Sequence, residues 1–272
     1  MSQQNYRAVL KSENRDISIY PSSNYARYQL VSPLTKVDHI ILEQFNMSNT
    51  TYLINDYNKQ LTFREGGAPI TTVLPVGNYN QTTFPALIAG AMTGSSGVGN
   101  TYTASISSAT GQMTINVSAG ITPFRLLFKS YPNSPFYETG FYVTRAIGID
   151  TPPSLTQIST YPVHLDTPTA VYIFIPELGN NMNLPYAPIG QPGSTVAATF
   201  FFPLSRSFTE SNYQFFNASP NQLAFDTKQK ITQLSVYLFD DLGRPLGTNG
   251  SEYTLELKFV YPVEYEITQG RR

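Results

Sequence analysis

Apolar and polar residues alternate most regularly between Ile231 and Val260. The apolar positions that share one face are Leu234, Val236 and Leu238 in the first half, then Tyr253, Leu255, Leu257 and Phe259 in the second. A period of two is typical of a strand that buries one face only. Between the halves, residues 240–250 are rich in Asp, Gly, Pro and Asn, which favour turns. The pattern therefore predicts a long antiparallel hairpin that is buried on one face.

Shorter segments with the pattern of strands lie on both sides of residues 51–150, where the pattern is different. They are Ile17–Tyr20, Ala26–Val31, Val37–Phe45, Ser159–His164, Ala170–Ile175, Ala197–Pro203 and Tyr213–Asn217. In the third of these, Ile40 and Leu42 are expected on the face opposite His39 and Ile41. Together with the hairpin, roughly eight strands at this spacing predict a mainly β fold, a β-sandwich. Residues Met1–Asp16 show no regular period and are predicted to form an arm outside the core.

Residues 51–150 are predicted to form a small α+β domain of their own. Its expected elements are a short hairpin of Tyr52–Ile54 with Gln60–Phe63, a strand at Ile70–Leu74, a helix at Thr83–Met92, a second hairpin of residues 102–106 with 113–117, and a strand at Phe124–Phe128. Thr83 is expected to cap the helix, and Pro85 lies in the first turn, where no N–H is needed. Thr93–Asn100 is expected to be a flexible tip.

Charge and composition narrow the classes of partner. Charged residues make up only 13% of the 272 residues, whereas Tyr (19) and Phe (17) are plentiful, a balance that suits wide contact surfaces. The net charge of −1 and the dispersed basic residues argue against binding to nucleic acid or to an anionic membrane. No apolar run approaches the roughly 20 residues that a bilayer span needs, and the start of the chain has no secretory signal, so a soluble chain is expected. The absence of cysteine excludes disulfides and thiolate metal sites.

Candidate chemistry is sparse. His39 and His164 are the only histidines, and neither belongs to a motif with metal-ligand spacing, so both are expected to be hydrogen-bonded structural residues. Gly94–Gly97 lacks the strand-to-helix setting of a nucleophile elbow and the lysine of a phosphate loop. We therefore predict no catalytic, metal or cofactor site and no enzymatic activity.

Three features of the sequence leave a functional role open at this point. A glycosidase needs only two carboxylates across a cleft, and Asp240 with Asp241, or Glu252 with Glu256, are the acids that could be proposed, although solvated acids are the expected state. The long Gly/Pro/Asn loop Glu177–Ser194 is expected to be functional or mobile. Six glycosylation sequons begin at Asn46, Asn49, Asn80, Asn116, Asn217 and Asn249, and chance in an Asn/Ser/Thr-rich chain explains most of them.

The layout resembles the penton (vertex) capsid proteins of virophages, Polinton-like viruses and nucleocytoplasmic large DNA viruses. The residues that carry the resemblance are Val37–Leu42 leading to Asn49–Tyr52, then Thr72–Tyr79 with the short helix, Tyr102–Val117 with its Thr110-Gly111 turn, and Leu234–Leu246 with Tyr253–Phe259. The likeness covers about four-fifths of the chain, in patterns rather than catalytic motifs.

The resemblance implies a single jelly-roll β-sandwich with an inserted small α+β domain. Residues 1–50 would be the arm and first jelly-roll strands, 51–150 the insert, and 151–272 the remaining strands. It further implies a structural protein that forms homopentamers at the five-fold vertices of an icosahedral virion, assembles inside the host cell and contacts the major capsid protein. A spike or minor capsid protein is a further candidate partner, although no motif names one. The alternative function is a carbohydrate- or receptor-binding β-sandwich on a virion surface or fibre.

Overall fold

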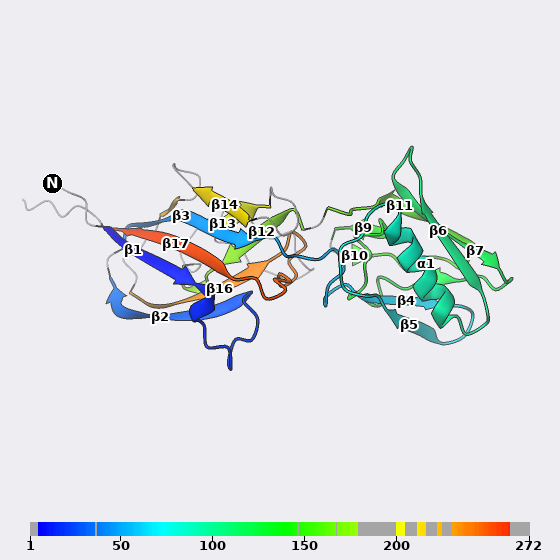
Figure 1. Cartoon of the computed structure of the whole chain (residues 1–272), viewed down its shortest axis with the longest axis horizontal. Coiled ribbons are helices and arrows are strands. Elements are labelled where there is room, and N and C mark those ends of the chain that lie inside the picture. The colour runs from blue at the N-terminus through cyan, green and yellow to red at the C-terminus, as the bar shows by residue number, and fades with distance from the viewer. Residues whose placement is uncertain are drawn as a thin grey trace, which may run out of the picture.

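The chain folds into two lobes that lie end to end along its longest axis (Figure 1). The structure is a computed structural model. It describes residues 5–35, 37–145, 147–166, 168–178, 200–204, 211–215, 222–224 and 230–261.

The first lobe contains two antiparallel sheets. One has the order β1-β17-β3-β14, with β15 beside β14 on the same edge of β3. Its strands are β1 (Asn5–Lys11), β17 (Tyr253–Val260), β3 (His39–Ser48), β14 (Ser211–Phe215) and β15 (Gln222–Ala224). The other sheet has the order β13-β12-β16-β2. Its strands are β13 (Phe200–Pro203), β12 (Ala170–Phe174), β16 (Ile231–Phe239) and β2 (Tyr25–Leu34).

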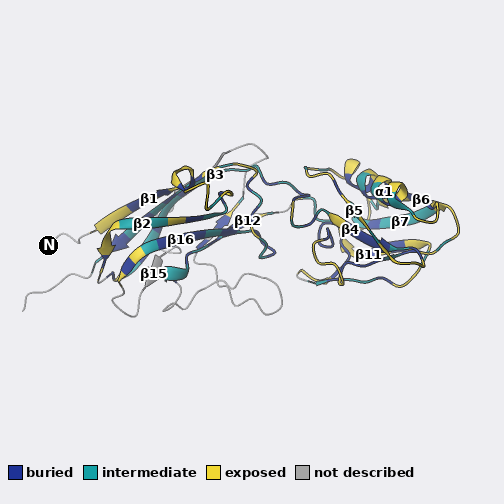
Figure 2. Cartoon of the chain, turned by 90° about the horizontal axis from the view of Figure 1, so that it is seen from below, coloured by how far each residue is buried: buried dark blue, intermediate teal, exposed yellow. Residues whose placement is uncertain are grey.

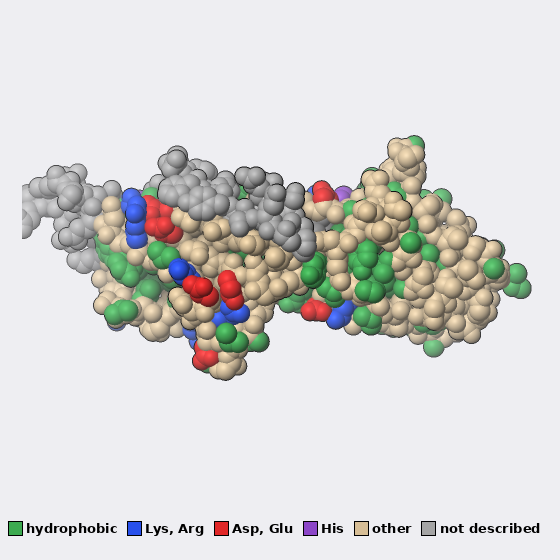
Figure 3. All heavy atoms as spheres, viewed as in Figure 1, with side chains coloured by type: hydrophobic (Ala, Val, Ile, Leu, Met, Phe, Trp, Pro, Cys, Tyr) green, Lys and Arg blue, Asp and Glu red, His purple; other side chains and the backbone are tan. Residues whose placement is uncertain are grey.

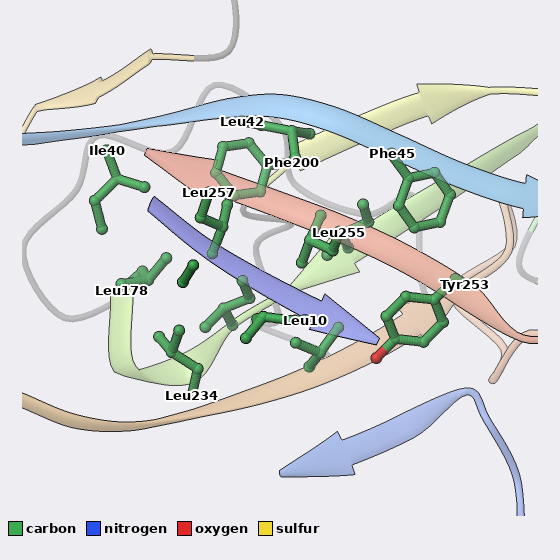
Figure 4. Packing of buried hydrophobic residues seen from close by; sticks show 14 of the residues in the cluster. Leu10, Ile40, Leu42, Phe45, Leu178, Phe200, Leu234, Tyr253, Leu255 and Leu257 are labelled. Carbon is green, nitrogen blue, oxygen red and sulfur yellow. The ribbon is translucent and has the colours of Figure 1, made fainter. Parts of the chain in front are cut away.

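One hydrophobic core joins these two sheets face to face, so the lobe is a β-sandwich (Figure 4). Alternate residues of β17 and β3 point into it, including Leu255, Leu257, Ile40 and Leu42, each fully buried. Across the interface Phe45 of one sheet meets Phe202 of the other edge to face, with ring centroids 4.7 Å apart. The predicted faces of β3 and of β17 are therefore confirmed.

The predicted hairpin between residues 231 and 260 is wrong in its pairing. β16 pairs with β2 and β12, whereas β17 pairs with β1 and β3 in the opposite sheet. Alternation shows which face of a strand is buried but not which sheet contains the strand. The 13 residues of Asp240–Glu252 are long enough to cross the roughly 10 Å between packed sheets.

Two predictions near the N-terminus are also wrong. Residues 5–11, expected in an arm, form β1 along β17, from Asn5 opposite Val260 to Lys11 opposite Thr254. Ala8 and Leu10 are buried in the sandwich core, because residues 5–11 do alternate. Ile17–Tyr20, expected as a strand, is instead a turn with Ile17 and Ile19 exposed, and it follows a 3₁₀ helix at Ser12–Asn14.

The second lobe contains two three-stranded sheets, a helix and a small two-stranded sheet. The strand orders are β11-β7-β6, β5-β4-β8 and β10-β9. The elements are β4 (Gln60–Arg64), β5 (Pro69–Val73), α1 (Thr83–Ser95), β6 (Thr101–Ile106), β7 (Gln112–Ala119), β8 (Arg125–Leu126), β9 (Tyr142–Thr144), β10 (Ile147–Gly148) and β11 (Thr156–Pro162). The lobe has its own core, separate from that of the sandwich (Figure 2).

The helix predicted for this lobe is confirmed, whereas its capping residue and one predicted strand differ from the prediction. The helix exists, and its first amides are capped by Asn80, whose Oδ1 accepts from the backbone N–H of Thr82 and of Thr83. Thr83 is therefore not the capping residue. Tyr52–Ile54 forms no strand and contributes only an isolated bridge from Ile54 to Gly77.

The segment Ser159–His164, expected in the sandwich, belongs to the second lobe. β11 pairs with β7 from Thr156 opposite Asn116 to Pro162 opposite Gln112. Val163 and Leu165 pack against the second core, so this lobe continues past residue 150. The second lobe thus lies, in sequence, between β3 and β12.

Most of the loop 177–194 lies outside the described residues, which here include only a 3₁₀ helix at Pro176–Leu178. Within the part of the chain that the structure describes, no helix is long and apolar enough to span a membrane.

Candidate functional site at the junction of the lobes

The connection between β16 and β17, Asp240–Glu252, lies where the two lobes meet, and we call it the junction loop. Leu242 near its start is buried in the core of the second lobe rather than in the sandwich. Gly247, near its middle, lies beside Asn55 of the second lobe. The loop that joins the two sheets of the sandwich therefore also docks the second lobe.

A buried ion network fixes this docking. The Arg244 guanidinium contacts Oδ2 of Asp240 at 2.7 Å through Nε and Oε1 of Glu138 at 3.1 Å through Nη2. The exposed fractions of these side chains are 12% for Arg244, 5% for Asp240 and 0% for Glu138. Glu138 belongs to the second lobe, where its Oε1 also accepts from Nδ2 of Asn58 at 2.8 Å. Burial opposes the charge of Arg244, but the two carboxylates outweigh it and raise its pKa.

The Asp240 carboxylate also accepts hydrogen bonds from the backbone of the loop, and these bonds explain the local shape of the loop. Its Oδ1 accepts from the backbone N–H of Leu242 at 2.9 Å and of Arg244 at 2.8 Å. Such a side-chain turn is characteristic of Asp and orients Arg244 toward its partners.

Asp241 points to the chain segment that returns from the second lobe. Its Oδ2 accepts from the hydroxyl of Thr169 at 3.0 Å, whereas its Oδ1 is buried with no hydrogen-bond partner among the described residues. Burial, followed by the neighbouring Asp240 charge, raises the pKa of Asp241. The expectation that Asp240 and Asp241 are solvated is wrong: both are about 95% buried.

The far end of the junction loop holds the segment that leaves the sandwich. Thr50 donates its hydroxyl to the carbonyl oxygen of Thr248 at 2.6 Å, and Asn249 donates its side-chain N–H to the carbonyl oxygen of Thr50. The Ser23 hydroxyl lies 2.7 Å from the Thr248 hydroxyl. The junction loop therefore binds both chain segments that cross between the lobes.

A polar cleft of about 300 Å³ opens beside this contact. It is lined by residues of three segments, 21–24, 55–57 and 246–250. The lining holds one carboxylate, Asp56, which pairs with Lys59 at 2.6 Å, so the cleft has no strong charge of either sign.

The second acid pair considered from the sequence does not form a site. Glu252 accepts from the buried guanidinium of Arg15, whose Nη1 lies 2.6 Å from its Oε1, and from the hydroxyl of Ser12. Burial opposes ionisation, but these two donors lower the pKa of Glu252 overall. Glu256 is instead 4.0 Å from Arg7 on the outer face of the sheet. The two acids serve different contacts.

The histidines are both hydrogen-bonded, as expected. Nδ1 of His39 lies 2.8 Å from Oδ2 of Asp38. His164 stacks on Tyr137 with ring centroids 4.3 Å apart, and its Nε2 lies 3.0 Å from the hydroxyl of Tyr142. Burial lowers the pKa of His164.

The tip Thr93–Asn100, expected to be flexible, is tethered by Glu65, a residue that the sequence reasoning missed. Its carboxylate accepts from the Ser96 hydroxyl at 2.8 Å, the Gly97 amide at 3.0 Å and the Asn100 side chain at 3.1 Å, and also from the Tyr102 hydroxyl at 2.6 Å. Burial, then the bond to Glu65, raises the pKa of Tyr102. A carboxylate that is 4% exposed is stable here because four donors surround it.

Each of these buried carboxylates thus has at least one structural partner, and the described residues contain no group of three or more His, Asp or Glu that could hold a metal ion. The contacts at the junction can hold the two lobes in a fixed relative orientation. Glu138 and Arg244 are 106 positions apart, and no local pattern links them.

Comparison with known proteins assigns no family. No protein-family profile matches the chain, and no curated protein sequence matches it significantly. Among solved structures, the chain is similar to a selenomethionine-labelled penton protein of mavirus, with 11% sequence identity and a TM-score of 0.42 over 94% of this chain and 99% of that chain.

Proposed function

We propose that this chain is a structural capsid protein, built on a single jelly roll that carries an inserted domain. The observation that supports the jelly roll best is the strand order. In that fold the first, eighth, third and sixth strands form one sheet, and the second, seventh, fourth and fifth form the other. Numbered along the sandwich, β1-β17-β3-β14 and β2-β16-β12-β13 follow this order. The second lobe would be the insert, between the third and fourth strands.

The capsid role rests on the sequence resemblance to penton proteins, because a jelly roll alone also occurs in lectins and cupins. That resemblance implies a jelly roll with an inserted domain. In the proposal, five copies form a ring at each five-fold vertex of a virion and contact the major capsid protein around them. Such a ring needs a heterologous interface, in which one flank of a copy meets a different flank of the next.

The junction suits this role physically. A shell component must present its projecting domain in a constant direction, and a buried ion pair is strongly sensitive to geometry. Arg244, Asp240 and Glu138 supply that constraint in addition to two covalent crossings.

Negative-stain imaging of the purified chain tests the proposal. The expected result is class averages of rings with five-fold symmetry, each unit showing a sandwich and a projecting second lobe. Isolated two-lobed particles at every concentration, or rings of another symmetry, would contradict it.

A carbohydrate-binding role is the second candidate, and one surface favours it. The outer face of the sheet β6-β7-β11 carries hydroxyl and amide side chains on all three strands, with Ile158 exposed on the edge strand β11. They are Thr101, Thr103, Ser105, Gln112, Thr114, Asn116, Ser118, Thr156 and Thr160. The chain from Gly66 to Phe124 contains no charged residue, and charges on the visible face gather over the sandwich (Figure 3). An uncharged hydrogen-bonding surface suits a neutral glycan better than an anionic one.

A glycan array tests this second candidate. Ile158→Lys would place a charge on this face, in its edge strand β11, whereas Val73→Lys changes a residue of similar exposure on another sheet (59% and 61%). Binding of a neutral glycan that only Ile158→Lys abolishes would support the role. No glycan bound by the unaltered chain, or equal loss in both variants, would refute it.

A further inference from the structure

Among the described residues, the outer edge of β1 has no strand paired to it. β1 is the end strand of its sheet and pairs on its inner side with β17 over all seven residues. No strand among the described residues pairs with its other side. Such an edge presents unpaired backbone N–H and C=O groups that can accept a further strand.

β1 is better suited to strand addition than β2, an end strand of the other sheet. It contains neither proline nor glycine, and its pairing with β17 shows no register shift. β2 contains Pro33, which has no N–H to donate, and its register shifts opposite Ile231 and Gln233. The two faces of β1 also differ: Ala8 and Leu10 reach the core, whereas Arg7, Val9 and Lys11 are exposed.

The C-terminal residues supply a sequence that fits this edge. From Val263 to Thr268 the chain reads Val-Glu-Tyr-Glu-Ile-Thr, with apolar residues at 263, 265 and 267 and polar ones between them. Alternation with β-branched and aromatic residues is the pattern of a strand with one buried face. We propose that Val263–Thr268 of one copy adds as a strand to the outer edge of β1 in a neighbouring copy. This inference rests on the proposed assembly of several copies.

The reach of the chain favours a second copy over the same chain. Val260 lies opposite Asn5, on the inner side of β1. The outer edge of β1 is two strand spacings away, about 9.6 Å, and the straight path runs through the backbone of β1 itself. Three Cα steps from Val260 to Val263 cover about 10 Å when fully extended, which leaves no length for a detour. This limit on chain length does not apply to the β1 strand of a neighbouring copy, because Val263 then does not have to pass around its own β1.

Charge and hydrophobicity agree with the same pairing. With Val263, Tyr265 and Ile267 turned toward the core side, Glu264 and Glu266 would stand on the outer face beside the cations of β1. The side chains of Arg7 and Lys11 are 63% and 48% exposed, although each already contacts a carboxylate, Glu43 or Glu13. Opposite charges on adjacent strands favour one register over its neighbours.

The full-length variant Tyr265→Pro tests the proposal, because proline removes a ladder N–H and fixes the backbone. Gln269→Pro, just beyond the alternating pattern, is the matched control. We expect Tyr265→Pro to lose the assembled species at concentrations where the unaltered chain and Gln269→Pro retain it, with unchanged far-UV circular dichroism. Equal assembly of both variants would overturn the inference and leave the proposed capsid role standing.

A second measurement decides the inference if the unaltered chain does not assemble, which would count against the capsid role itself. A fluorescent peptide of residues 262–269 is titrated into the Tyr265→Pro chain. Saturable binding, with slower hydrogen exchange at the amides of Asn5–Lys11, supports strand addition. No saturable binding, or binding that leaves those amides unprotected, overturns it.

Discussion

Replacing Arg244 by methionine is the perturbation that most directly tests the role of the lobe junction. The change leaves Glu138, which is fully buried, without its cation, and removes one partner of Asp240. At the observed 3.1 Å separation the gross attraction to Glu138 is about 5 kcal/mol at an effective dielectric constant of about 20. Removing one partner of a buried pair typically costs about 3–5 kcal/mol, because the remaining charge stays desolvated. We expect a loss in that range.

Urea denaturation followed by far-UV circular dichroism measures this loss, since the chain has no tryptophan. The two lobes need not unfold in one transition, so hydrogen exchange at the amides of Leu242 and Arg244 should be measured alongside the urea titration.

Arg7→Ala is the control: its pair with Glu43 is exposed on the Arg side, and the substitution should cost less than about 1 kcal/mol. Adding Glu138→Gln to Arg244→Met should recover about half of the loss, because no buried charge is left unpaired at position 138. A loss below about 1 kcal/mol for Arg244→Met, or no recovery in the double variant, would refute the reasoning.

Three further predictions concern other sites. Glu65→Ala should destabilise the second lobe by about 3 kcal/mol, because it leaves buried donors unpaired, and should speed hydrogen exchange at Gly97 and Asn100; unchanged exchange there would contradict the tether. The pKa of Asp241 is raised in the folded state, so stability is lost as the pH rises from the unfolded-state value of 3.8 through the folded-state pKa; Asp241→Asn should gain in stability relative to the unaltered chain over that rise in pH, and a pH-independent difference would contradict this. Gly140→Ala should cost more than about 3 kcal/mol in thermal unfolding, because φ is +79° and a Cβ would lie 2.2 Å from the Tyr161 carbonyl oxygen, whereas Gly66→Ala, at φ +83° in open space, should cost about 1 kcal/mol.

The sequence predicted the faces of strands better than their partners. In β17 the apolar positions 253, 255, 257 and 259 are all buried, as their alternation requires. The same alternation predicts a hairpin of β16 with β17, whereas the two strands lie in opposite sheets. Pairing is a long-range property: it depends on how sheets stack and on what the connecting loop must cross. Residues 5–11 also alternate, but the alternation is short and is surrounded by polar and charged residues, so it does not predict a strand on its own.

The junction could not have been predicted from local patterns. Asp240 and Asp241 stand among turn-forming residues, where exposure is the usual state, yet the second lobe covers them. Their burial depends on Glu138 and Thr169, which are distant in the sequence. The Asp240 side-chain turn is local and typical of Asp-containing loops, so that part could have been inferred. The absence of metal-ligand spacing was visible directly in the sequence.

The mass of the species in solution tests the central claim most directly. For a vertex protein, native mass spectrometry of the 30.2 kDa chain should give a dominant species of five copies, about 151 kDa, at micromolar concentration. A monomer at 30.2 kDa under all conditions, or a dominant species of any other copy number, would contradict a homopentameric capsid role.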